Sequence, residues 1–163
     1  MNKKAKTVLL VYGMGGHAAQ MNRLAEHFVP IDGKDKMYLT FSDQGNKPYW
    51  SNKHILGEEI RDKQSSTGLF GLCKGILNSL TQSIKIFKMY NIRLVISTGP
   101  GAVIIPSIIA RLLGVRVIHL ETWSRIETYS FTGRLMYRIA SEFWIQHRSL
   151  QMLYPKAKFV GLL

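Results

Sequence analysis

Short apolar runs alternate along the chain with longer segments whose apolar residues recur every three or four positions. The first pattern is typical of strands buried in a parallel sheet, and the second of helices with one apolar face. Strands are expected at residues 7–12, 36–42, 94–98, 116–121, 143–146 and 158–160. Helices are expected at residues 15–28, 69–89, 102–113, 132–140 and 150–154. The polar residues 52–63 fit neither pattern.

Strands that alternate with helices at this spacing predict an α/β fold, a Rossmann-like parallel sheet with helices on both faces. The length of 163 residues allows one such domain, residues 1–163, with a sizeable core, and leaves no room for two full catalytic domains. Ligands of such folds bind beyond the carboxyl ends of the strands, so the candidate chemistry is sought there.

A glycine-rich segment, Gly13, Gly15 and Gly16 followed by His17, links the first predicted strand to the first predicted helix. Glycines there permit a tight turn, and the backbone N–H groups of a helix amino terminus attract phosphate. The segment is not a dinucleotide fingerprint, because Ala18 stands where a third glycine is required. A turn that serves only packing is the alternative. His17 could act as a general base near neutral pH, or it could cap the helix or donate to a phosphate.

Three further strand ends carry polar or small residues. Thr98, Gly99 and Gly101 open another helix and could form a second anion site. Glu121 and Arg125 follow the next strand, where they suit hydroxyl and phosphate recognition, although an ion pair between them is an equal alternative. Ser130 begins one more predicted helix and adds a hydroxyl.

The charge of the chain is strongly basic, at +12 with 22 Lys and Arg against 10 Asp and Glu. Residues 1–60 carry 8 basic and 6 acidic side chains, whereas residues 61–163 carry 14 and 4. Such an excess of positive charge indicates a polyanionic partner. Nucleic acid ranks behind anionic lipid and phosphorylated substrates, because no recognised nucleic-acid module is present. The histidines and the single cysteine lack metal-ligand spacing, so neither a metal site nor a cofactor is expected.

The predicted helix at residues 69–89 has one apolar face and lies within a basic stretch, residues 61–93, whose net charge is +5. Its apolar stripe could pack on the sheet or enter the headgroup region of a membrane. We expect the segment 66–90 to lie at an anionic membrane surface. The residues expected to make that contact are Leu69, Phe70, Leu72, Lys74, Ile76 and Leu77.

Taken in order, the polar strand ends resemble those of the acceptor-side, membrane-anchoring subunit of two-subunit UDP-sugar glycosyltransferases. This group includes the anchor subunit of the eukaryotic dolichol-linked N-acetylglucosaminyltransferase and bacterial PssD-like capsule and exopolysaccharide proteins. The segments that carry the resemblance are Gly13-x-Gly15-Gly16-His17, Ser97-Thr98-Gly99-Pro100-Gly101, Glu121-Thr122-Trp123-Ser124-Arg125, Ser130-Phe131-Thr132-Gly133-Arg134, Gln146, Tyr154-Pro155 and Gly161.

The resemblance implies a fold equivalent to the N-terminal half of a MurG-like GT-B glycosyltransferase. It implies that Gly13, Gly15, Gly16 and His17 contact a polyprenyl-diphosphate-linked sugar acceptor. It further implies that residues 99–101, with Glu121 and Arg125, line the same crevice. The eukaryotic subunit has an amino-terminal membrane-spanning anchor that has no counterpart in this sequence.

The expected function is therefore the acceptor-binding part of a heteromeric inverting glycosyltransferase, inactive without a UDP-sugar-binding catalytic subunit. His17 is expected to be the general base or to orient the diphosphate, and Glu121 is the competing base. The expected location is the cytoplasmic face of the cell membrane, as a peripheral (monotopic) protein. The alternative is a non-catalytic membrane anchor or scaffold for the transferase.

Overall fold

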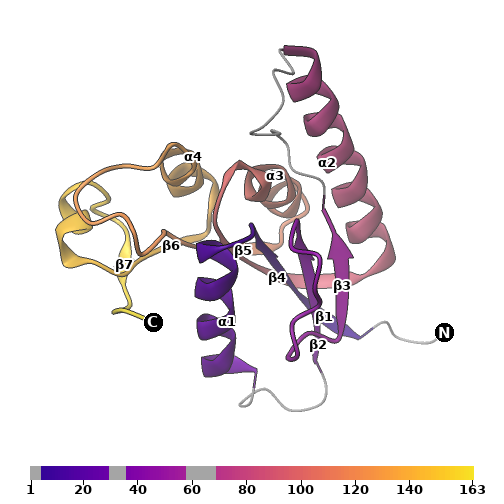
Figure 1. Ribbon diagram of the computed structural model, residues 1–163, viewed down its shortest axis with the longest axis horizontal. Coiled ribbons are helices and arrows are strands. Elements are labelled where there is room, and N and C mark those ends of the chain that lie inside the picture. Colours follow the sequence, from indigo (N-terminus) through magenta and orange to yellow (C-terminus); the bar gives the residue numbers. More distant parts are fainter. Residues whose placement is uncertain (1–4, 30–35, 58–68) are drawn as a thin grey trace.

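The computed structural model describes residues 5–29, 36–57 and 69–163. In that part of the chain, seven strands form one parallel sheet in the order β3-β2-β1-β4-β5-β6-β7 (Figure 1). The strands are β1 (Lys6–Tyr12), β2 (Lys36–Ser42), β3 (Lys53–Leu56), β4 (Asn91–Thr98), β5 (Arg116–Leu120), β6 (Glu142–Ile145) and β7 (Lys158–Phe159). The chain passes from β1 outward to β3 and then returns to β4 on the other side of β1. The carboxyl ends of β1 and β4 therefore form a topological switch point.

Helices cover both faces of the sheet (Figure 1). They are α1 (Gly16–Phe28), α2 (Leu69–Met89), α3 (Ile104–Leu112) and α4 (Phe131–Ile139), with short 3₁₀ helices η1 (Gly101–Val103) and η2 (Arg148–Met152). Helix α1 covers one face alone, and α2, α3 and α4 lie in sequence across the other. The fold class predicted from the sequence is confirmed.

The side chains of β1 alternate between the two faces of the sheet. Leu10 and Tyr12 pack in the same apolar cluster as Met21 and Ala25 of α1. Leu9 and Val11 point the other way, into a second cluster that includes Ile86 of α2, Ala110 of α3 and Met136 of α4. Because β1 is buried on both faces, its sequence is a continuous apolar run.

Three segments differ from the sequence-based expectation. The helix expected at residues 150–154 is instead the 3₁₀ helix η2, which covers Arg148–Met152. The polar segment around residue 54 forms β3, a four-residue strand that pairs only with β2 at the edge of the sheet. An edge strand with partly exposed side chains needs no apolar run, which explains why the pattern did not reveal it. The helix expected from residue 102 begins instead as η1, and its α-helical part starts at Ile104.

Candidate functional site

Two glycine loops meet at the switch point between β1 and β4. A Cβ atom added to Gly13 would lie 2.6 Å from ring carbons of Pro100. A Cβ atom on Gly99, whose φ is +123°, would lie 2.9 Å from Cγ of His17. The Thr98 hydroxyl donates a 3.1 Å hydrogen bond to the His17 carbonyl oxygen. Gly13 and Gly99 are therefore required for the close packing of the two loops around His17.

The remaining glycines at this edge leave open space. Nothing lies within 4 Å of a Cβ atom added to Gly15 or Gly101, and one at Gly16 would meet only Nε1 of Trp123, at 4.0 Å. Gly15 caps α1 with a φ of 67° and supplies no side-chain cap. The amino terminus of α1 therefore has no side-chain cap and borders open space, and helix amino termini of this kind attract anions.

This space is a cavity of about 330 Å³, within the size range of small-molecule sites. It brings together six of the residues predicted from the sequence, namely Gly16, His17, Gly99, Glu121, Arg125 and Ser130. Pro100, Thr122, Trp123, Ser124 and Thr132 complete the lining. The other four predicted residues are not part of the lining. Gly13 and Thr98 are buried in the contact between the two loops, whereas Gly15 is exposed and Gly101 is partly exposed.

A second histidine lies beneath the cavity. His119 of β5 is 1% exposed, and its Nδ1 is 2.8 Å from the Ser97 hydroxyl. Burial, reinforced by the charge of His17, lowers the pKa of His119 to about 3. His119 is therefore neutral at physiological pH, whereas His17 is partly exposed in the cavity wall.

Glu121 follows β5 and is 2% exposed, yet its carboxylate has no cation as partner among the described residues. Its Oε1 accepts from the Thr122 backbone N–H at 3.0 Å and from the Ser130 hydroxyl at 3.0 Å. Its Oε2 accepts from the Tyr154 hydroxyl at 3.0 Å. The ion pair with Arg125 considered from the sequence is not formed, because the Arg125 guanidinium donates to the Thr128 hydroxyl instead.

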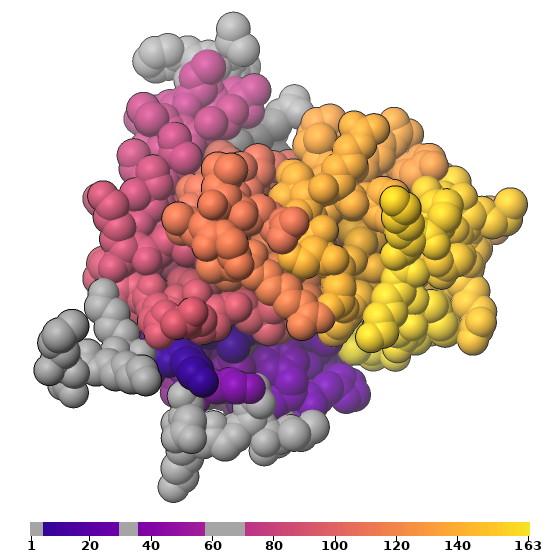
Figure 2. Space-filling view, turned by 180° about the vertical axis from the view of Figure 1, so that it is seen from behind, coloured from indigo at the N-terminus to yellow at the C-terminus, as the bar shows by residue number. Residues whose placement is uncertain are grey.

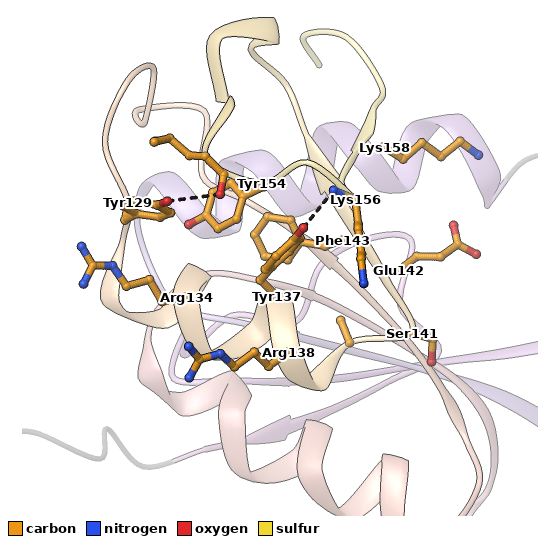
Figure 3. Close-up of a pocket in the computed structure, with 12 residues that line it drawn as sticks. Tyr129, Arg134, Tyr137, Arg138, Ser141, Glu142, Phe143, Tyr154, Lys156 and Lys158 are labelled. Carbon is orange, nitrogen blue, oxygen red and sulfur yellow. Dashed lines mark hydrogen bonds between the residues drawn. The ribbon is translucent and has the colours of Figure 1, made fainter. Parts of the chain in front are cut away.

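A larger groove of about 1,050 Å³ lies on the far side of Tyr154 (Figure 3). The rings of Tyr137, Phe143 and Tyr154 pack together at its centre, with centroids 4.6 to 5.3 Å apart. Four cations line it, Arg134, Arg138, Lys156 and Lys158. Tyr154 thus forms part of the groove wall, and its hydroxyl reaches the carboxylate that lines the crevice.

Sequence reasoning missed Trp123, Gly133 and Tyr154 as site residues. The indole of Trp123 lines the crevice and carries the Arg23 guanidinium 4.9 Å from its ring centroid. Gly133 and Tyr154 lie beside the Glu121 carboxylate. All three occur in the motifs that carried the resemblance, but no spacing rule assigned them a contact.

Part of the exposed surface of α2 is apolar, which the sequence could not determine. Side chains exposed by 38 to 59% are Leu72, Ile76, Leu77, Leu80 and Ile84, whereas Ser79 and Ser83 are buried. Helix α3 lies beside α2 (Figure 2). It adds the exposed side chains of Ile108 and Leu112, and Leu113 directly after it is exposed as well. Lys74 is exposed beside this surface, and the side chains of Leu69 and Phe70 lie outside the described part.

No helix in the described part of the chain has the length and apolar character needed to span a bilayer. Residues 5–29, 36–57 and 69–163 also contain no group of three or more His, Cys, Asp and Glu side chains that could hold a metal ion.

Comparison with known proteins identifies related chains over nearly the whole length. The family model described as oligosaccharide biosynthesis protein Alg14 like matches residues 8–163. The chain is 27% identical to the UDP-N-acetylglucosamine transferase subunit ALG14 of Saccharomyces cerevisiae, over 99% of this chain and 78% of that one. It is 23% identical to the subunit of the same name from Homo sapiens, over 98% of this chain and 83% of that one.

Solved structures share the fold. MurG of Acinetobacter baumannii aligns with a TM-score of 0.66 at 17% identity, over 96% of this chain and 44% of MurG. A UDP-N-acetylglucosamine 2-epimerase aligns with a TM-score of 0.65 at 15% identity, over 94% of this chain and 45% of the epimerase. The chain therefore spans less than half the length of these structures. The resemblance stated from the motifs is confirmed, and the chain belongs to the Alg14-like family of oligosaccharide biosynthesis proteins.

Proposed function

We propose that this chain is the acceptor-binding subunit of an inverting glycosyltransferase and that its crevice holds a sugar linked to a polyprenyl diphosphate. The observation that carries the proposal is the cavity at the β1–β4 switch point. There the uncapped amino terminus of α1, the His17 imidazole and the Arg125 side chain share one space. This combination suits a ligand with a phosphate group beside a reacting hydroxyl.

The diphosphate is bound by the first-turn N–H groups of α1 and by Arg125. Both favour anions, the first through the helix dipole and the second through a full positive charge. Gly16 leaves the approach to the helix amino terminus open, because a Cβ atom there would meet only the Trp123 indole. The acceptor sugar then lies toward His17 and Trp123.

His17 removes the proton from the acceptor hydroxyl as the hydroxyl oxygen attacks the anomeric carbon of the donor sugar. The new glycosidic bond forms as the bond from that carbon to UDP breaks, and UDP leaves with the electron pair. General-base assistance of this kind typically contributes 10²- to 10⁴-fold to a rate. Alternatively, His17 orients the diphosphate without transferring a proton, and the pH dependence of the rate separates the two roles.

The donor site belongs to a second polypeptide in this proposal. The relatives are named as transferase subunits, which supports a second subunit that carries the donor site. The relatives are called UDP-N-acetylglucosamine transferase subunits, so UDP-N-acetylglucosamine is the first donor to test. The bacterial members of the group that the motifs resemble favour capsule or exopolysaccharide assembly as the setting.

The apolar surface of α2 attaches the complex to the cytoplasmic face of the membrane. Soluble domains bury the apolar stripe of such a helix, but here Leu77 is 59% exposed while Ser79 and Ser83 face inward. The amino-terminal half of α2 lies toward the carboxyl edge of the sheet (Figure 1). The residues that line the crevice follow the strands at this same edge. A lipid-linked acceptor could therefore enter the crevice while its polyprenyl chain stays in the bilayer.

Binding to vesicles tests the membrane contact. Replacing Leu77 by Gln removes an apolar side chain from the proposed interface and should lower partition onto vesicles with anionic lipid about tenfold. Tyr49→Gln is the matched control, because Tyr49 is 81% exposed and lies beside Glu26 of α1 on the opposite face. An equal loss of vesicle binding in both variants, or no loss in Leu77→Gln, contradicts the proposed membrane contact of α2.

Co-expression with the product of the neighbouring reading frame tests the functional proposal. The co-purified complex should transfer sugar from one member of a UDP-sugar panel to a polyprenyl-diphosphate-linked acceptor, and this chain alone should not. Efficient transfer by this chain alone contradicts the need for a partner. If the complex transfers sugar but this chain neither binds the acceptor nor needs its crevice, the scaffold alternative is correct.

A further inference from the structure

We infer that Glu121 is a positioning residue, which fixes the segment from Thr122 to Gly133 that lines the crevice, and that it does not act as a base. This inference deepens the proposed function and rests on it for the kinetic part. Three sets of contacts carry it: those of the Glu121 side chain, those of the Glu121 backbone, and the close approach of Gly133.

Both carboxylate oxygens are already occupied. Thr122 and Ser130 donate to Oε1, and Tyr154 donates to Oε2, each at 3.0 Å. The Ser130 hydroxyl is also 3.2 Å from Oε2. A general base must offer a free oxygen to the proton it removes, whereas these oxygens bind three protein donors in a site that is 2% exposed.

The donors come from the two ends of the crevice segment and from outside it. Thr122 begins the segment, and Ser130 is the N-cap of α4, where its Oγ also accepts from the Gly133 N–H at 2.7 Å. Tyr154 follows η2, 33 positions from Glu121. One carboxylate therefore joins β5, the start of α4 and the chain after η2.

The Glu121 backbone is held as firmly as its side chain. Its carbonyl oxygen accepts from Nε2 of Gln20 at 2.9 Å and from Nε2 of Gln146 at 3.3 Å. Its N–H donates to the Trp144 carbonyl oxygen at 2.9 Å. Helix α1 and strand β6 thus fix the point from which the side chain extends, so that the carboxylate has a defined position.

Gly133 allows the amino terminus of α4 to approach this carboxylate. A Cβ atom at that position would overlap Oε2 of Glu121 and lie 2.6 Å from the Tyr154 hydroxyl. The buried negative charge is thereby balanced by the dipole of α4 and by hydroxyl donors rather than by a cation. The pKa of the Tyr154 hydroxyl is raised by burial and by the Glu121 carboxylate, so that this hydroxyl stays protonated and donating.

Hydrogen exchange on the full chain tests the positioning directly. Tyr154→Phe removes one donor to Glu121 from the groove side, without touching the crevice (Figure 3). Loss of a hydrogen bond to a charged group should raise amide exchange in residues 122–133 at least about tenfold. Tyr137→Phe is the control, because its hydroxyl accepts from the Lys156 N–H and not from any group at Glu121. Glu121→Gln, which keeps the size of the side chain, should loosen the same segment.

Kinetics of the co-purified complex supply the second measurement. Tyr154→Phe and Glu121→Gln should raise the acceptor KM several-fold and change kcat little, and Tyr137→Phe should change neither. Unchanged exchange in residues 122–133 of Tyr154→Phe overturns the inference. So does a hundredfold or greater fall in kcat of Glu121→Gln at unchanged exchange and KM, which is the result expected for a base. The exchange measurement needs no substrate, so it remains valid even if the complex proves to have no transferase activity.

Discussion

Replacing Gly133 by Ala distinguishes the effect of helix propensity from that of the contact with Glu121. Helix propensity predicts a higher free energy of unfolding, whereas the contact predicts a lower one. Gly133 lies inside α4, where Ala is favoured over Gly by about 1 kcal/mol. In this structure the added Cβ atom would overlap Oε2 of Glu121 and crowd the hydroxyls of Tyr154 and Ser130. The carboxylate must therefore move away from its donors, or α4 must shift.

The expected cost exceeds the gain in propensity. Overpacking a buried site costs about 1–3 kcal/mol. Losing one hydrogen bond to the buried carboxylate costs about a further 1.5–3 kcal/mol. Set against the gain of about 1 kcal/mol from the helix, the free energy of unfolding should fall by about 3 kcal/mol. For a chain of this length, that corresponds to a fall in Tm of roughly 6–12 °C.

Urea unfolding of the purified chain, followed by circular dichroism, measures the change. The midpoint should fall while the slope m stays constant, since the unfolded surface is the same. Gly45→Ala is the control, because nothing lies within 4 Å of a Cβ atom there and its φ is not positive. That variant should keep the wild-type midpoint within about 0.5 kcal/mol. A Gly133→Ala chain as stable as the wild type, or more stable, would refute the account of the Glu121 site.

Two other stability predictions follow from the loops and the buried histidine. Gly13→Ala should lose about 1–3 kcal/mol of unfolding free energy, because its Cβ atom would lie 2.6 Å from the Pro100 ring, and a wild-type urea midpoint would contradict the contact. The pKa of His119 is about 3 when folded and about 6.5 when unfolded, so its stabilisation is complete above pH 6.5 and declines as the pH falls toward 3. The decline is up to roughly 1.4 kcal/mol per pH unit, and His119→Asn should flatten the dependence between pH 6 and pH 4. Equal slopes in the two proteins would show that His119 is not held neutral.

The sheet could be predicted because its central strands are buried on both faces. The sequence of β1 is apolar at consecutive positions, since Leu9 and Leu10 contact opposite helical layers. The edge strand β3 escaped prediction because His54 and Ile55 are only partly buried there.

The two glycine loops could be predicted as candidate anion sites because they lie between strands and helices. The sequence could not predict which of these glycines are needed for packing and which border open space. Whether an added Cβ atom would meet Pro100 depends on a contact between residues more than 80 positions apart. The same limit concealed the contact between Glu121 and Tyr154, which are 33 positions apart.

Helix α2 shows a further limit of the sequence pattern. Its bounds, Leu69–Met89, were predicted from the spacing of its apolar residues. The pattern could not say which face the sheet covers. Only the structure shows Ser79 and Ser83 turned inward and Leu77 turned outward, because this depends on how the helix is rotated about its axis.

We propose that this chain supplies the acceptor site of a glycosyltransferase, with His17 at the reacting end of the crevice. The most direct measurement is sugar transfer from a UDP-sugar to a polyprenyl-diphosphate-linked acceptor by the co-purified complex carrying His17→Ala. The His27→Ala complex is the control, because His27 is exposed at the other end of α1. We expect kcat/KM for the acceptor to fall at least about a hundredfold in His17→Ala and not in His27→Ala, with the complex still assembled. Transfer by His17→Ala at the wild-type rate would contradict it.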